Sequence, residues 1–134
     1  MKEDIQKPKV KNVTLAIAKK VNELNAVEWH VYLINNNSFD IENTLVSSTG
    51  YGKKDGEEQK TSTLRHFLQT VAAKSTALIE PINPDVFHLN NEYWVSYYIG
   101  STIYDKKFIF VPDSIQDENL VYIKELKMEG ILHS

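Results

Sequence analysis

The densest group of side chains suited to ligand binding lies between residues 53 and 66. It combines lysines, three consecutive hydroxyl residues, the single arginine of the chain and a histidine: Lys53, Lys54, Lys60, Thr61, Ser62, Thr63, Arg65 and His66. We expect a helix to begin at the hydroxyl residues, because a side-chain oxygen at an N-cap accepts an unpaired amide of the first turn. Those amides and the helix dipole would favour an anion. The segment therefore predicts a site for a small anionic ligand.

Two other interpretations of this segment stay open. The glycine-rich loop at 50–56 matches neither a phosphate-binding Gly-x-x-x-x-Gly-Lys-[Ser/Thr] motif nor the dinucleotide fingerprint, so it is also typical of a solvated connection. Alternatively, His66 acts as an acid or base in a small enzyme on an anionic metabolite. No serine elbow is present, and the four histidines share no metal-ligand spacing. We predict no catalytic residues, no metal and no cofactor.

Two segments with helical spacing would position this site. Residues 60–75 place Leu64, Phe67, Leu68 and Val71 at i, i+3, i+4 and i+7, which predicts an amphipathic helix with Phe67 buried. Residues 12–25 place Val13, Ile17, Val21 and Leu24 on one helical face and predict a first helix.

The remaining chain indicates strands at residues 28–35, 43–51, 76–80, 92–99 and 102–111, with residues 112–134 left unassigned. The expected order is α-β-β-α-β-β-β. Hairpins join most of the strands, which favours antiparallel pairing. We therefore expect an α+β fold. It is a single domain over residues 10–134, preceded by a flexible tail at 1–9. A mainly antiparallel sheet of about five strands would carry both helices on one face.

The hairpin at 92–111 has two faces of different character. Glycine at position 100 predicts a type II′ turn with a two-residue loop, which pairs Ile99 with Thr102. One face is apolar and suits the core. The other face holds four candidate interface residues: Trp94, Tyr98, Ile103 and Lys107.

Three interpretations of this second face stay open. It is a partly solvated face with Trp94 packed under the stem of Lys107, a dimer interface, or a platform on which nucleic-acid bases stack. We expect self-association, with a homodimer that buries Trp94. The composition, with 42% hydrophobic and 25% charged residues, is ordinary for a globular protein.

Charge and segment length limit the partners. A formal net charge of −3 argues against broad electrostatic binding of nucleic acid, and the absence of cysteine excludes disulfides and thiolate chemistry. The polar start of the chain does not match a secretory signal, and no apolar run has the length of a membrane span. The expected location is the cytoplasm, with no membrane partner.

Three sequence blocks carry a resemblance to a known group of proteins. They are Lys-Thr-Ser-Thr-Leu-Arg-His at 60–66, Leu-Asn-Asn-Glu-Tyr-Trp-Val at 89–95 and Lys-Lys-Phe-Ile-Phe at 106–110. Together they resemble a family of short, largely uncharacterised bacterial α+β proteins, some labelled phenylalanyl-tRNA synthetase subunit. The resemblance implies a link to aminoacylation. Three functions stay open: a non-enzymatic binding or regulatory domain, which we expect first, the small enzyme on an anionic metabolite, and an accessory translation module. The last would bind RNA, tRNA or a nucleotide through Lys53, Lys54, Lys60 and Arg65.

Overall fold

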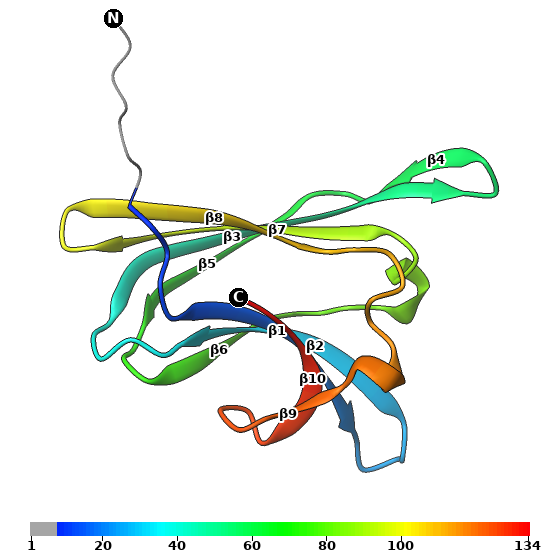
Figure 1. Ribbon diagram of the computed structural model, residues 1–134, viewed down its shortest axis with the longest axis horizontal. Coiled ribbons are helices and arrows are strands. Elements are labelled where there is room, and N and C mark those ends of the chain that lie inside the picture. The colour runs from blue at the N-terminus through cyan, green and yellow to red at the C-terminus, as the bar shows by residue number, and fades with distance from the viewer. Residues whose placement is uncertain (1–7) are drawn as a thin grey trace, which may run out of the picture.

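Two antiparallel β-sheets pack face to face in the computed structural model, which describes residues 8–134 (Figure 1). The first sheet has the strand order β6-β2-β1-β10-β9, and the second has the order β4-β3-β7-β8 with β5 also paired to β3. The strands are β1 Val13–Val21, β2 Val27–Asn35, β3 Ile41–Lys54, β4 Glu57–Lys60, β5 Leu64–Val71, β6 Ser75–Pro81, β7 Asn90–Ile99, β8 Thr102–Phe110, β9 Val121–Ile123 and β10 Met128–His133.

The expected α+β class is wrong, because the described residues contain no α-helix. Their helical structure consists of two single 3₁₀ turns, Pro84–Val86 and Asp117–Asn119. The core is therefore covered on each side by a sheet, and not by a sheet and two helices. Seven of the nine residues of the predicted tail lie outside the described residues.

The predicted helix at 12–25 is β1 followed by a tight turn. Val13, Leu15 and Ile17 alternate along β1 and are all buried, so an i, i+4 spacing of apolar residues here also satisfied a period of two. Nine residue pairs join β1 to β2, and five join it to β10. This pairing satisfies the backbone of β1 on both sides, which outweighs the modest intrinsic preference for a helix.

The predicted helix at 60–75 is β5 together with its flanking turns. His66 and Leu68 face inward, and Phe67 faces outward with 59% of its surface exposed, so the prediction of a buried Phe67 is wrong. Gln69 has a positive φ of 58° where the β3–β5 register shifts. This bulge turns Val71 back into the core, and the resulting 64–68–71 pattern mimics a helical stripe.

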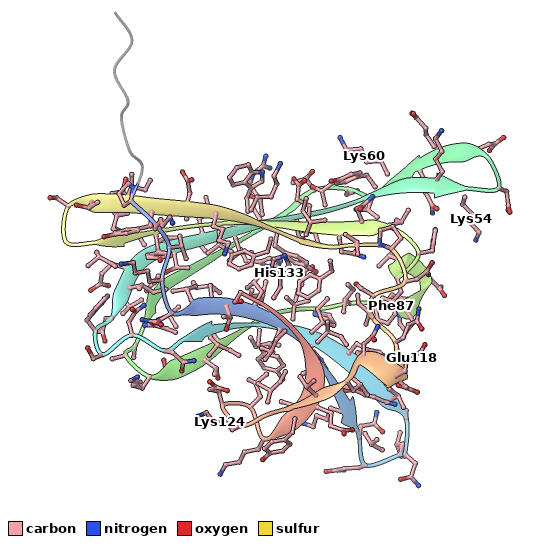
Figure 2. The ribbon with its side chains drawn as sticks, viewed as in Figure 1. Lys54, Lys60, Phe87, Glu118, Lys124 and His133 are labelled. Atoms are coloured by element: carbon pink, nitrogen blue, oxygen red, sulfur yellow. The ribbon has the colours of Figure 1, made fainter. Side chains whose placement is uncertain are left out.

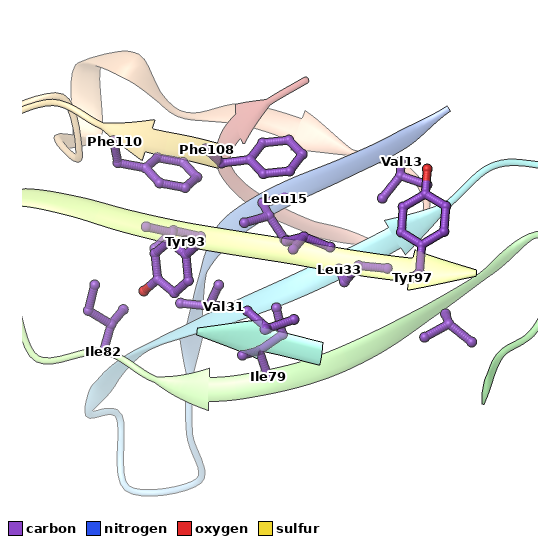
Figure 3. Close-up of a cluster of buried hydrophobic side chains, with 14 of the residues drawn as sticks. Val13, Leu15, Val31, Leu33, Ile79, Ile82, Tyr93, Tyr97, Phe108 and Phe110 are labelled. Carbon is purple, nitrogen blue, oxygen red and sulfur yellow. The ribbon is translucent and has the colours of Figure 1, made fainter. Parts of the chain in front are cut away.

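The hairpin formed by β7 and β8 confirms the sequence prediction. Ile99 pairs with Thr102, Trp94 pairs with Lys107, and Gly100 adopts a φ of 62°, as the turn requires. The more apolar face is the buried one: Tyr93, Tyr97 and Phe108 are among the largest fully buried side chains. Figure 3 shows them meeting residues of the first sheet, such as Leu15 and Leu33, between the two layers.

The C-terminal residues extend the first sheet. Figure 1 shows β9 and β10 in the layer of β1 and β2, where β10 pairs with β1 and β9 pairs with β10. They pack Ile123 and Leu126 against Ala16 and Ile34 on the far side of that sheet. The outer face of the second sheet therefore receives no cover from residues 120–134.

Candidate functional site

Four polar side chains from four strands meet in the interior at Glu80. The Oε1 atom of Glu80 accepts a hydrogen bond from Ser48 Oγ at 3.0 Å and lies 2.6 Å from His66 Nε2. Its Oε2 atom accepts a hydrogen bond from Tyr93 at 3.3 Å. Glu80 belongs to the first sheet and its three partners to the second. The carboxylate therefore cross-links the two sheets at their edge strands, β6 and β5.

A bulge explains why a glutamate points into a sandwich core. On β2, Val31 pairs with Glu80 and the next residue, Tyr32, pairs with Leu78, so β6 carries one extra residue at this point. Two consecutive residues of β6, Ile79 and Glu80, are therefore both buried, and Glu80 is only 9% exposed. A carboxylate this buried needs partners, which the three hydrogen bonds supply.

The electrostatics of the cluster keep Tyr93 in its protonated form. Burial raises the pKa of Tyr93 far above its ordinary value, and the neighbouring charge of Glu80 and its hydrogen bond raise it further. At neutral pH the phenol hydrogen therefore stays on Tyr93, which donates it to Glu80.

A cavity of about 220 Å³ opens beside this cluster. Glu80, Ser48 and Tyr93 contribute its polar wall. Its other lining comes from β3, from the β4–β5 connection, and from the chain that follows β6: Thr49, Gly50, Thr61, Ser62, Leu64, Pro81, Ile82, Asn83, Val86 and Asn91.

A second feature is the outer face of the second sheet, the face turned away from the first sheet. Five large apolar side chains on it are between 36% and 59% exposed: Leu45, Phe67, Trp94, Tyr98 and Ile103. Lys107 lies over the ring of Trp94, with its Nζ 5.4 Å from the ring centre, which is the contact described by the first of the three interpretations of this face.

Cross-strand neighbours on the outer face form two adjacent rows across β5, β3, β7 and β8. The Leu45 row consists of Phe67, Leu45, Ser96 and Asp105. The Trp94 row consists of Arg65, Ser47, Trp94 and Lys107. In each row a large residue on one central strand stands beside a serine on the other.

The eight residues predicted to form an anion site lie in several places. Thr61 and Ser62 line the cavity, and His66 reaches it indirectly through Glu80. Arg65 lies on the opposite face of β5, in the Trp94 row. The remaining four lie elsewhere: Thr63 shares a hydrogen bond with Thr49, and Lys53, Lys54 and Lys60 belong to the β3–β4 hairpin, which projects beyond the sandwich (Figure 2).

The helix N-terminus that motivated an anion site is absent, because residues 64–71 form a strand. Sequence reasoning singled out His66 and missed its partners Glu80, Ser48 and Tyr93. A single acidic residue at the end of the apolar segment 77–79 was the signal for Glu80, but the bulge that turns it inward has no sequence signature.

Two features are absent from the described part of the chain, residues 8–134. No group of three or more histidine, cysteine, aspartate or glutamate side chains within residues 8–134 is arranged to hold a metal ion. No helix in the same range is long and apolar enough to cross a membrane. No family model, curated protein or solved structure matches the chain, so the resemblance to synthetase-labelled proteins stays a prediction.

Proposed function

We propose that this protein is a binding domain that self-associates through the outer face of the second sheet to form a homodimer. The observation that carries the proposal is the gathering of five half-exposed apolar side chains on one open sheet face. Three of them, Phe67, Trp94 and Tyr98, are aromatic, and aromatic residues are enriched at protein interfaces.

The size of this apolar surface supports association. An aromatic side chain presents roughly 150–250 Å², so the exposed fractions of the five side chains sum to roughly 400–500 Å². Patches of that size on soluble proteins are commonly interaction sites. With the polar residues of the two rows included, the face approaches the roughly 800 Å² that each partner contributes to a stable interface.

The two rows are complementary to each other, which favours a second copy as the occupant. Consider a two-fold axis in the interface that runs across the strands and passes between the rows. It places each strand over its own copy and the Leu45 row over the Trp94 row. Trp94 then faces Ser96 of the second copy, and Leu45 faces Ser47, so each large side chain meets a small one.

The charges follow the same symmetry. The axis places Asp105 opposite Lys107 of the second copy, and it places Phe67 opposite Arg65. The first pair joins opposite charges, and the second brings a guanidinium over an aromatic ring. Packed sheets are rotated by about 30°, so the match is closest at the central strands β3 and β7.

Light scattering behind size exclusion tests the proposal. We expect the wild-type mass to be twice the chain mass of 15.4 kDa, and we expect Trp94→Glu to be monomeric, because an unpaired carboxylate in an interface core is costly. Tyr122→Glu is the matched control. Tyr122 is exposed on β9 of the first sheet, so this variant should remain dimeric.

A monomeric wild type at micromolar concentration would contradict the proposal. A Trp94→Glu dimer would place the interface elsewhere. A monomer that binds mixed tRNA with salt-sensitive affinity would instead favour the accessory translation module, because contacts with phosphates weaken steeply as salt rises.

A further inference from the structure

We infer that the cavity beside Glu80 binds a small primary amine in its ammonium form. This site lies in the interior of one chain, on the opposite side of the second sheet from the proposed dimer face. The inference concerns the polarity of the cavity wall, which is set by the hydrogen bonds that its hydroxyl groups already make.

The hydroxyl hydrogens of the polar wall are committed. Ser48 and Tyr93 both donate to the Glu80 carboxylate, and Thr61 donates to the carbonyl oxygen of Ser62. A hydroxyl has one hydrogen to give, so each of these groups presents only lone pairs to the cavity. The side-chain amide donors of Asn91 are also engaged, since its nitrogen donates to the carbonyl oxygens of Val86 and Leu89.

The groups of the cavity wall that remain available to a ligand are hydrogen-bond acceptors. Glu80 Oε2 accepts only the long bond from Tyr93, while a carboxylate oxygen has room for two. Asn91 Oδ1 accepts no hydrogen bond from the described residues and lies 3.5 Å from the point where a Cβ on Gly50 would stand. Thr49 and Thr63 share one hydrogen bond in which either hydroxyl can be the donor, and the other uncommitted side-chain donors of the lining, on Ser62 and Asn83, belong to exposed residues at its rim.

The charge of the lining has one sign. Glu80 is the only acidic residue among the lining residues, and none of them is lysine, arginine or histidine. His66 bonds the Oε1 atom and does not line the cavity. His66 forms an ion pair with Oε1 when its ring is protonated, and Oε2 has room for a second donor beside Tyr93. A ligand therefore meets a buried carboxylate, where the low dielectric strengthens the attraction of a cation.

The shape of the cavity defines the rest of the ligand. Leu64, Ile82 and Val86 supply apolar walls that suit a short hydrocarbon body. A volume of about 220 Å³ is below the roughly 300–1,000 Å³ of pockets for drug-sized ligands. An ammonium group has three N–H donors and no acceptor, which is the complement of this wall. A small alkylammonium ion fits the acceptors, the negative charge and the size of this cavity.

The competing account is that Glu80 only cross-links the two sheets. Glu80→Gln separates the two roles: the amide keeps one oxygen to accept from Ser48 and His66, so the cross-link is largely preserved, and it removes the negative charge. Leu64→Trp is a second variant, because it narrows the cavity from its half-exposed rim and leaves the carboxylate in place. Glu58→Gln, an exposed residue of β4, is the matched control.

The experiment is a ¹H–¹⁵N NMR titration with n-butylammonium chloride. Three compounds serve as controls: 1-butanol has the same body without charge, butyrate has the opposite charge, and tetraethylammonium has the same charge without an N–H donor. For a ligand of this size we expect saturable shifts of the amides of Ser48, Gly50 and Asn91 with a Kd on the order of 1 mM.

The expected pattern is at least tenfold weaker binding of the three controls, and at least tenfold weaker binding of n-butylammonium to Glu80→Gln and Leu64→Trp than to Glu58→Gln. The inference is overturned if these amides do not respond, if 1-butanol or tetraethylammonium binds equally well, or if calcium chloride produces the same shifts, which would indicate a metal site. Light scattering on the same samples keeps the dimer proposal separate, since amine binding does not depend on it.

Discussion

Replacing Gly130 by alanine would place a methyl group between β10 and the centre of the first sheet. A Cβ on Gly130 would lie 2.6 Å from the carbonyl oxygen of Ile17 and 2.9 Å from Cα of Ala18, both on β1. A third contact, also at 2.9 Å, is Cδ1 of Ile123. Two of these atoms are backbone atoms of a strand paired on both sides, so a side-chain rotation cannot relieve the overlap.

The magnitude follows from two opposing effects. Overpacking of this kind costs about 1–3 kcal/mol, and the backbone contacts favour the upper part of that range. Alanine also restricts the unfolded chain, which offsets about 0.4–1 kcal/mol. We expect a net loss of about 1–2 kcal/mol in the free energy of unfolding, which lowers Tm by about 3–8 °C in a domain of this size.

Thermal and urea unfolding followed by tryptophan fluorescence measure this loss. Glu129→Ala is the control, because Glu129 is the exposed neighbour of Gly130 in β10 and its removal should change stability by less than about 0.5 kcal/mol. In open space the glycine-to-alanine change stabilises a chain. An unchanged or higher Tm for Gly130→Ala would therefore show that β10 does not pair with β1.

Two further predictions concern the second sheet. Gly100→Val should destabilise the protein by about 1 kcal/mol or more, because valine disfavours the positive φ of the β7–β8 turn; a chemical-denaturation midpoint equal to that of the wild type would contradict the turn. Stability should also fall as pH rises above about 10. Burial, and next the nearby Tyr104, raise the pKa of Tyr97 to about 12, and burial and Glu80 raise that of Tyr93 further. The unfolded tyrosines lose their protons first, so stability present below pH 10 is lost between pH 10 and 12 at up to about 1.4 kcal/mol per pH unit for Tyr97. Urea titrations from pH 8 to 12 measure the slope, and a flat profile would mean that neither phenol is buried.

Local signals in the sequence predicted local structure well. The β7–β8 hairpin, its register and the positive φ of Gly100 follow from a glycine in a two-residue loop between alternating strands, and all three are confirmed. The exposed positions of Trp94, Tyr98 and Ile103 follow from the same alternation. These features depend on residues close together in the chain.

The two predicted helices failed because their apolar spacing had two solutions. In β1, Val13 and Ile17 are four residues apart, a distance that fits both a helix and a strand. In β5, a bulge at Gln69 converts strand alternation into an apparent helical stripe. Long-range pairing decides between the solutions, and neither segment contains the information about its partner strands.

The candidate site was predictable only in part. Thr61, Ser62 and His66 lie at or beside the cavity, so the sequence pointed to the correct region. Glu80 and its neighbours come from three other strands, and they converge through a β6 bulge and the stacking of two sheets. Whether the cavity favours a cation or an anion depends on which hydroxyl and amide hydrogens of its wall already make hydrogen bonds. Those hydrogen bonds are visible only in the folded protein.

Sedimentation analysis of a charge swap at the two rows tests the dimer most directly. The proposed axis places Asp105 opposite Lys107 of the second copy, so Asp105→Lys and Lys107→Asp each create two like-charge contacts and should weaken the dimer, whereas the double variant restores both pairs. We predict a wild-type species of twice 15.4 kDa, weakened association in each single variant, and recovered association in the double variant. A wild-type monomer, or a double variant that associates no better than the single variants, would contradict the proposed interface.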